Sequence, residues 1–312
     1  MLRKIWLLVI LIMFVGLLAC GKADSTQKIK FPDMNLEKVV REAINKPEGP
    51  IHVNEVQGIL SLKANDSNIE NLEGLQYCTQ MVSLELQRNT INDISPLSTM
   101  KGLTKLWIVG NNIENISPLS SLTGLTELEI RANQIIDISP LSELVNLHVL
   151  GLAGNQIEDV SSLAKLTKLE NLDLGGNRIS DISSLANLTN MGSLLLMMNK
   201  VSDLSALSSM TELRNLYLNG NKITDISPLA NLTKLEILDI MGSPEGNQIE
   251  DIAPLASSKN LVQLRLPNNL IEDISVLTEL PKLQTLWIMV NPLDEKSEGI
   301  IQDLKNKGIE VR

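Results

Sequence analysis

Asparagine recurs at a fixed interval along most of this chain, and that period limits the possible folds more than any other feature. Six successive steps between these asparagines span 22 residues each, one step spans 26, and two more span 22. A unit of this length cannot bury its own apolar side chains, so successive units must stack into an elongated array. The ten positions are Asn89, Asn111, Asn133, Asn155, Asn177, Asn199, Asn221, Asn247, Asn269 and Asn291.

The units share the pattern LxxLxLxxNxIxDISPLxxLTx. In its first half, Leu106 and Ile108 alternate with Lys105 and Trp107, which predicts a short strand with one buried face. The second half has a capping Asp and an early Pro but no room for a full α-helix, which predicts a 3₁₀ turn. Eleven repeats begin at Ile59, Met81, Leu103, Leu125, Leu147, Leu169, Met191, Leu213, Leu235, Leu261 and Leu283.

This pattern predicts an α/β repeat solenoid, a right-handed leucine-rich repeat horseshoe with parallel strands on its concave face and 3₁₀ turns on its convex face. Amphipathic segments at both ends predict helical caps. The expected divisions are a lipoprotein signal peptide at 1–19, a lipid-anchored tether at 20–30, an N-terminal helical cap at 31–58, the repeats at 59–293 and a C-terminal cap at 294–312.

The first residues indicate export. Arg3 and Lys4 precede an apolar run that is shorter than the roughly 20 residues needed to span a bilayer. The run ends at LLAC, which resembles a bacterial lipobox, so we expect cleavage before Cys20 and lipidation of that residue. The alternative is a secretory signal with another cleavage point. The chain is therefore expected on the extracellular side of a bacterial membrane, as a monomer.

Four stretches resemble the bacterial leucine-rich repeat proteins of the internalin type: FPDMNLEKVVREAINKPEGPI, NIENLEGLQYC, the repeated NxIxDISPLxxLT and NPLDEKSEGI. The resemblance covers residues 31–312 and implies a curved solenoid that binds a partner on its concave face. No immunoglobulin-like segment follows the repeats and no LPxTG motif is present, so attachment to the cell would depend on Cys20.

Two columns of the repeat are expected to be structural. The asparagine amides can satisfy backbone groups beside each strand, and the Asp column can cap the turns without forming a calcium loop. We expect no metal site and no cofactor. Catalysis is not expected either, because His52 and His148 lie apart and no nucleophile is set beside them. Cys78 falls in a core column, which predicts a buried free thiol.

One outward column of the strands concentrates the rarest side chains. Aromatics are only 2% of the chain, yet Trp107, Tyr217 and Trp287 all lie between paired leucines. Trp, Tyr and Arg dominate binding hot spots, so we interpret this face as a recognition surface. The predicted protein-binding residues are Trp107, Val109, Glu129, Arg131, Leu195, Met197, Tyr217, Arg265, Trp287 and Met289.

Spacing and charge favour a protein partner. Strands about 4.8 Å apart place Trp107 roughly 24 Å from Tyr217, too far for a short sugar to bridge. Without residues 1–19 the chain has 25 Lys plus Arg against 37 Asp plus Glu, which disfavours nucleic acid. The predicted function is a cell-surface lipoprotein that binds a protein ligand as a receptor, adhesin or scaffold. The alternatives are a cell-wall glycan binder and a structural envelope lipoprotein.

Overall fold

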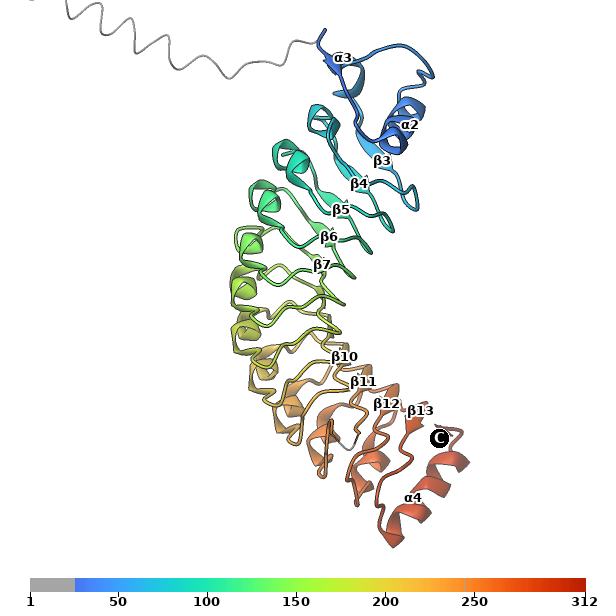
Figure 1. Ribbon diagram of the computed structural model, residues 1–312. Helices are drawn as coiled ribbons and strands as arrows, with labels where there is room; N and C mark the ends of the chain where they lie inside the picture. The colour runs from blue at the N-terminus through green and yellow to red at the C-terminus, as the bar shows by residue number, and fades with distance from the viewer. Residues whose placement is uncertain (1–25, 244) are drawn as a thin grey trace, which may run out of the picture.

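The computed structural model describes residues 26–243 and 245–312, and it shows a curved solenoid with a cap at each end (Figure 1). The leader, Cys20 and the first part of the tether lie outside the described residues. Eleven strands, one per repeat, run parallel in sequence order, as the repeat pattern predicts. They are β3 (Ser61–Lys63), β4 (Ser83–Glu85), β5 (Lys105–Trp107), β6 (Glu127–Glu129), β7 (Val149–Gly151), β8 (Asn171–Asp173), β9 (Ser193–Leu195), β10 (Asn215–Tyr217), β11 (Ile237–Asp239), β12 (Gln263–Arg265) and β13 (Thr285–Trp287).

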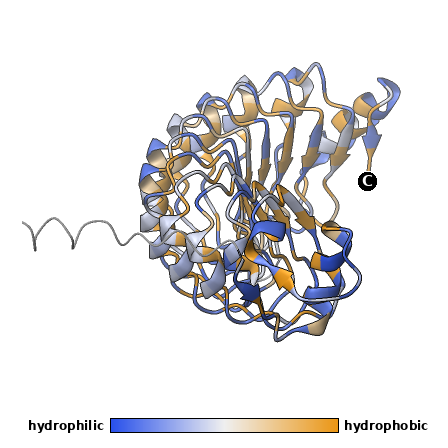
Figure 2. Cartoon of the chain, turned by 90° about the horizontal axis from the view of Figure 1, so that it is seen from above, coloured by the Kyte–Doolittle hydropathy of each residue, from blue (hydrophilic) through white to orange (hydrophobic). Residues whose placement is uncertain are grey.

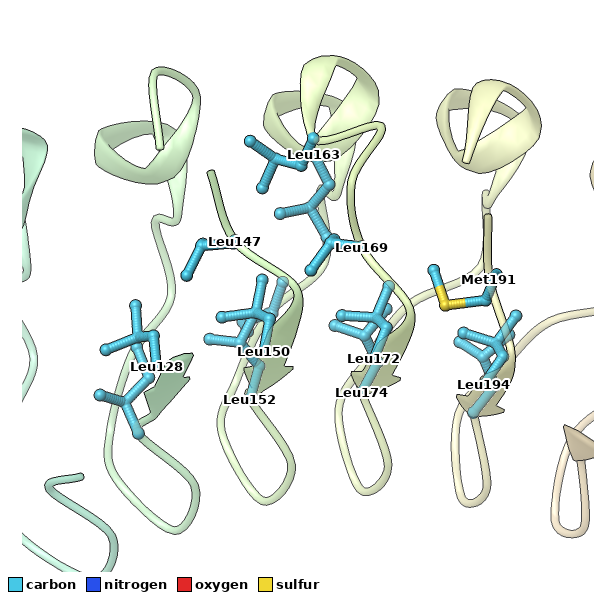
Figure 3. Packing of buried hydrophobic residues seen from close by; sticks show 14 of the residues in the cluster. Leu128, Leu147, Leu150, Leu152, Leu163, Leu169, Leu172, Leu174, Met191 and Leu194 are labelled. Carbon is cyan, nitrogen blue, oxygen red and sulfur yellow. The ribbon is translucent and has the colours of Figure 1, made fainter. Parts of the chain in front are cut away.

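The strands are held in strict register by the leucine at their centre. Leu84 pairs with Leu106, which pairs with Leu128, and the same alignment continues from repeat to repeat. The flanking leucines and isoleucines of each repeat are buried and pack between neighbouring repeats (Figure 3). The core is therefore one continuous aliphatic column, and each repeat contributes an almost identical layer to it.

Each of the first ten repeats crosses the opposite side of the solenoid through a short 3₁₀ turn, so the turns line the outside of the arc and the strands line its inside (Figure 2). In the second repeat, Asp93 accepts hydrogen bonds from the backbone N and the Oγ of Ser95, at 2.8 and 2.9 Å. The capping residues therefore act through Asx-turns one position before the helical N-cap. The turns are η1 (Leu75–Tyr77), η2 (Ser95–Thr99), η3 (Ser117–Ser121), η4 (Ser139–Leu141), η5 (Ser161–Lys165), η6 (Ser183–Asn187), η7 (Ser205–Ser209), η8 (Ser227–Asn231), η9 (Ala253–Ser257) and η10 (Ser275–Glu279).

The N-terminal cap contains helix α2 (Met34–Ala43) and the short helix α3 (Val53–Val56). The Asp33 side chain accepts from two N–H groups of α2, and its second oxygen accepts from the backbone N–H groups of Glu70 and Asn71 at 2.7 and 3.1 Å. One carboxylate thus begins the cap helix and also fastens the cap to the first repeat. Burial opposes ionisation of Asp33, but these backbone N–H groups outweigh it and lower its pKa.

The tether predicted at 20–30 is too long at its C-terminal end. Residues 28–29 form strand β1 (Lys28–Ile29), which pairs antiparallel with β2 (Ile51–His52) of the cap. The Ile29 side chain is 8% exposed and joins the hydrophobic core, which explains why this segment is ordered against the cap rather than free. The cap therefore includes residues that we had assigned to the tether.

The C-terminal cap consists of helix α4 (Glu295–Asn306) and strand β14 (Glu310–Val311). Leu304 is buried, and Ile300 and Ile301 are partly buried against the hydrophobic core, as the amphipathic pattern predicts. Gly308, with φ of 83°, turns the chain after the helix. Strand β14 then pairs with β13 as a twelfth strand of the sheet, which the repeat count did not predict.

Candidate functional site

The ladder asparagines cross-link neighbouring repeats through their side-chain amides. Asn177 Oδ1 accepts from the backbone N of Ile157 at 3.0 Å, and its Nδ2 donates to the backbone O of Leu152 and Leu174 at 3.1 and 2.9 Å. Equivalent bonds recur along the ladder, and nine of the ten asparagines are buried. These amides satisfy backbone groups that the narrow turn would otherwise leave unpaired, and their side chains are not available to a ligand.

Side chains alternate in direction along each strand, so the column that contains Trp107, Tyr217 and Trp287 lies on the inner face of the arc. Trp107 and Trp287 each follow a fully buried leucine, and both indole rings remain partly exposed. Tyr217 occupies the same position in β10 and is also partly exposed. None of the three aromatics belongs to the aliphatic core, so all three can contact a ligand.

The other predicted binding residues share this face. Arg131 and Met289 are exposed, and the remaining ones are partly exposed. Two charged residues of the aromatic column differ from the expectation of a solvated surface, because Glu85 and Asp239 are only 7% and 6% exposed. Both carboxylates are paired with a cation from an adjacent strand, Lys63 and Arg265 respectively, which explains their burial.

The surroundings of Trp107 are charged on every side. Lys105, two residues earlier on the same strand face, places its Nζ 3.6 Å from the centroid of the indole. Glu85 and Glu129 are the register partners of Trp107 on the two neighbouring strands. The indole Nε1 is buried without a hydrogen-bond partner. The ring therefore has a cation–π contact with Lys105, and its register partners on both neighbouring strands are glutamates.

Trp287 has a similar arrangement at the other end of the face. The guanidinium carbons of Arg265 and Arg312 lie 4.7 and 5.3 Å from the indole centroid. Arg265 also reaches Asp239, with Nη1 to Oδ2 at 3.3 Å. The two predicted residues Arg265 and Trp287 thus form one unit, and Arg312, the residue after strand β14, completes it.

A charged cluster occupies the middle of the face. Arg131 Nε lies 2.9 Å from Glu129 Oε2, and Arg131 Nη1 lies 3.4 Å from Asp173 Oδ2. A Cβ on Gly151 would stand 1.8 Å from that same Glu129 oxygen, so the carboxylate lies directly over the glycine. Burial raises the pKa of Glu129, although Arg131 opposes the rise. The predicted residues Glu129 and Arg131 are therefore brought together, with Asp173 as a third member.

Two of the three cations beside the tryptophans, Lys105 and Arg312, were absent from the predicted set. Lys105 could have been found, because residues two apart on a strand share a face. Arg312 could not, since it lies beyond the repeats and reaches Trp287 only through the unpredicted strand β14. The structure also shows a column of left-handed residues just before the ladder asparagines, including Arg88, Met198 and Val290. The glycines at 110, 154, 176 and 220 were the signal for it.

The groups considered for catalysis lie far from this face or are engaged locally. His52 Nδ1 is 3.2 Å from Glu55 Oε2 in the cap, and His148 Nδ1 is 2.9 Å from the backbone O of Asn146. Cys78 is a buried free thiol, and burial raises its pKa to about 12. Residues 26–243 and 245–312 contain no cluster of three or more His, Cys, Asp or Glu that could hold a metal ion. Within the same ranges, no helix has the length and apolar character needed to cross a membrane.

Comparison with known proteins agrees with this geometry. The family described as Leucine Rich repeats (2 copies) matches residues 101–144, 145–187, 167–209, 189–231 and 211–257. Among solved structures, an internalin (inlF) from Listeria monocytogenes is 33% identical, with a TM-score of 0.81, over 90% of this chain and 88% of that one. An internalin C2 from the same species is 37% identical, with a TM-score of 0.66, over 68% of this chain and 97% of its own length.

A third similar structure shows the fold alone. It is a plant peptide hormone receptor, RGFR1, in complex with RGF2, and it is 24% identical with a TM-score of 0.62. The match covers 70% of this chain and 37% of the receptor. No curated protein matches the chain.

The repeats, the sheet and the 3₁₀ turns define a leucine-rich repeat solenoid. Given the two Listeria structures, the chain belongs to the bacterial leucine-rich repeat proteins of the internalin type.

Proposed function

We propose that this chain is an exported bacterial surface protein that binds a protein partner on its concave face. Proteins with this fold typically mediate protein–protein interactions, and internalin-like proteins are found at the bacterial surface or are secreted. The plant receptor of the same fold is in complex with RGF2. Membrane attachment through a lipid on Cys20 is part of the proposal and is supported by the lipobox-like LLAC sequence.

One observation carries the proposal: three of the four aromatics of the repeats, Trp107, Tyr217 and Trp287, stand on the inner strand face, although the core is built from aliphatic side chains. Folding does not require an aromatic at an outward position. Binding does benefit from one, because partly buried Trp and Tyr beside paired charges are typical hot-spot residues. The cations at both tryptophans add groups that a partner carboxylate can meet.

The same geometry favours a protein over a cell-wall glycan. A sugar stacks its face against an aromatic ring, and in this chain a cation already lies against the ring of Trp107 and of Trp287. An extended protein surface can contact the ring edge, the cation and the neighbouring carboxylates together. The Glu129, Arg131 and Asp173 cluster supplies such a charged area between the aromatics.

Crosslinking in intact cells followed by mass spectrometry tests this proposal. We expect one protein to be recovered with the native chain, and its yield to fall roughly tenfold or more in Trp107→Ala or Trp287→Ala, as expected for hot spots. Lys165→Ala on the convex turn η5 is the matched control and should leave the yield unchanged. Unaltered recovery in both tryptophan variants, or binding to purified wall polysaccharide that Trp287→Ala abolishes, would reject the proposal.

The lipid anchor needs a separate measurement. Radiolabelled palmitate should be incorporated into the native chain and not into Cys20→Ala, and the variant should move from the membrane fraction to the medium. Equal labelling of both proteins would show that Cys20 is not the lipid attachment site.

A further inference from the structure

Near the C-terminal end, the residue types change at two positions of the repeat, the ones directly after and directly before the ladder asparagine. The position after the ladder asparagine is polar in eight successive repeats and then becomes Leu270 and Pro292. The position before it is left-handed for nine of the ten ladder asparagines, and the last repeat places Val290 there with φ of 59°. A β-branched residue is strained in that conformation, whereas glycine is not. Leu270 and Val290 are 43% and 71% exposed, so neither contributes much to the core.

These departures converge on one groove. A hollow of about 560 Å³ is lined by Asn268, Leu270, Val290 and Pro292, among others. A second hollow of about 570 Å³ shares Leu270 and Pro292 and extends toward turns η9 and η10. Because the same two apolar residues border both hollows, we treat them as one surface and call it the rim groove.

The outer half of the rim groove is acidic. Glu250, Asp251, Glu272 and Asp273 line it, and no Lys or Arg does. Among the residues that the structure describes, none of these four carboxylates forms an ion pair. Asp251 Oδ1 and Asp273 Oδ1 accept from the backbone N of Ala253 and Ser275. The groove therefore presents negative charge that the described part of the chain does not neutralise with an ion pair.

Equivalent hollows elsewhere on the solenoid are smaller. Around Ile136, which is also exposed, the two hollows measure about 240 and 280 Å³. Gln134 borders one of them where Leu270 borders the rim groove. The larger size of the rim groove thus coincides with apolar Leu270 and Pro292, in the last two repeats, where the hollows around Ile136 have a polar residue.

We propose that the rim groove binds an extended polypeptide segment of a partner in which an aliphatic side chain is flanked by Lys or Arg. The aliphatic side chain packs over Leu270 and Pro292, and the basic side chains meet the carboxylates of Glu250 and Glu272. A second copy of this chain is disfavoured as the occupant, because the chain has a formal net charge of −10. An anionic membrane surface is disfavoured by the same charge. This inference does not depend on the concave-face proposal.

Selection of random dodecapeptides displayed on phage, with the full chain as bait, tests the inference. We expect enriched peptides to carry Lys or Arg on both sides of an aliphatic residue. Fluorescence polarisation with the enriched peptides should show binding that weakens roughly tenfold or more in Glu250→Lys/Glu272→Lys, since like charges then oppose each other. Leu270→Ser, at an exposed position, should weaken binding without lowering the thermal unfolding midpoint, measured by circular dichroism.

The smaller hollow supplies the matched control. Glu114→Lys and Ile136→Ser make the same two kinds of change there and should leave peptide binding intact. Enrichment of peptides without basic residues, or peptide binding that persists in Glu250→Lys/Glu272→Lys, would overturn the inference. Concentration-dependent dimers in sedimentation velocity that disappear in Leu270→Ser would overturn it too, because the occupant would then be a second copy.

Discussion

The guanidinium carbon of Arg265 lies 4.7 Å from the centroid of the Trp287 indole, across one pair of strands. The same guanidinium reaches the carboxylate of Asp239 on the other side. One side chain therefore fixes an aromatic ring and neutralises a carboxylate that is almost fully buried. Three neighbouring strands, β11 to β13, contribute one residue each to this arrangement, so its geometry depends on the register of the sheet.

Removing the charge of Arg265 should destabilise the fold although the residue lies at the surface. Arg265→Ala leaves Asp239 buried without its partner and removes the cation–π contact, and we expect a loss of about 1–3 kcal/mol in the free energy of unfolding. Urea denaturation followed by circular dichroism measures it. Lys105→Ala, whose cation–π partner is Trp107, is the control: Lys105 meets only the half-exposed Glu127, so a smaller loss is expected. Equal effects would mean that Asp239 does not need the ion pair.

Asn177→Ala should cost about 1–3 kcal/mol of stability, because three backbone groups of two repeats lose a buried hydrogen-bond partner. The exposed Asn171 on strand β8 offers a matched control, and Asn171→Ala should stay within about 0.5 kcal/mol of the native chain. The midpoints of chemical denaturation of the native chain, Asn177→Ala and Asn171→Ala measure these differences. A midpoint for Asn177→Ala that equals the native one would show that the ladder does not stabilise the fold.

The repeats were predictable from sequence because each column is sampled many times. A single Leu or Asn is ambiguous, whereas its recurrence at 22-residue intervals identifies the strand, the inward face and the turn. Trp107 was correctly predicted to point away from the core for the same reason. Strand β14 and the β1–β2 pair were missed because they are two residues long and occur once, so no periodicity reveals them.

The electrostatics of the concave face were harder to predict. That Glu129 lies over Gly151 depends on the direction of one side chain across a strand pair, which the residue types alone do not determine. The burial of Asp239 likewise depends on the pairing with Arg265, 26 residues later. The left-handed conformation of Val290 could not be predicted from its own repeat, because the glycines that indicate this conformation occur in other repeats.

Gly242, in the loop after strand β11, and Gly151, in strand β7, should respond very differently to alanine. A Cβ at Gly242 would lie 2.0 Å from the backbone O of Asn268 and 2.6 Å from that of Asn247, and neither oxygen can move without the chain. At Gly151 the obstacle is the flexible carboxylate of Glu129. We expect Gly242→Ala to lower stability by about 1–3 kcal/mol or more and Gly151→Ala by clearly less, in thermal denaturation. The reverse order would show that the backbone crossing near residue 242 can relax.

Cys78 should be chemically inert in the folded chain. Its side chain is buried, and its pKa of about 12 leaves almost no thiolate at neutral pH. Ellman's reagent should therefore react with it slowly in native buffer and at the rate of an ordinary thiol in concentrated urea. The assay uses Cys20→Ala, so that only one thiol is counted. Rapid reaction before unfolding would mean that the first repeat opens in the native state.

The N-terminal cap should lose stability as the pH falls from 4.5 toward about 2, before the repeats do. The pKa of Asp33 lies below its ordinary value of 3.8 in the folded chain, and that of Glu55 is lowered to about 2, first by the hydrogen bond from Lys46 and then by the backbone N–H of His52. A carboxyl whose pKa falls on folding stabilises the folded state above its unfolded pKa, and the contribution is lost as the pH drops toward the folded pKa. For Glu55 this window runs from 4.5 down to about 2.

Hydrogen exchange measured by mass spectrometry at a series of pH values tests this order, once intrinsic exchange rates are corrected for pH. Protection of α2 and of residues 28–29 should fall between the two pKa values of Glu55, while the strands of the central repeats stay protected. Asp33→Asn removes the carboxylate oxygen that accepts hydrogen bonds from the backbone N of Glu70 and Asn71. The cap of this variant should be less protected at neutral pH, and its protection should change less as the pH falls. Uniform loss of protection along the chain would instead show that cap and repeats unfold as one unit, and that the carboxylate at Asp33 does not set the limit of acid stability.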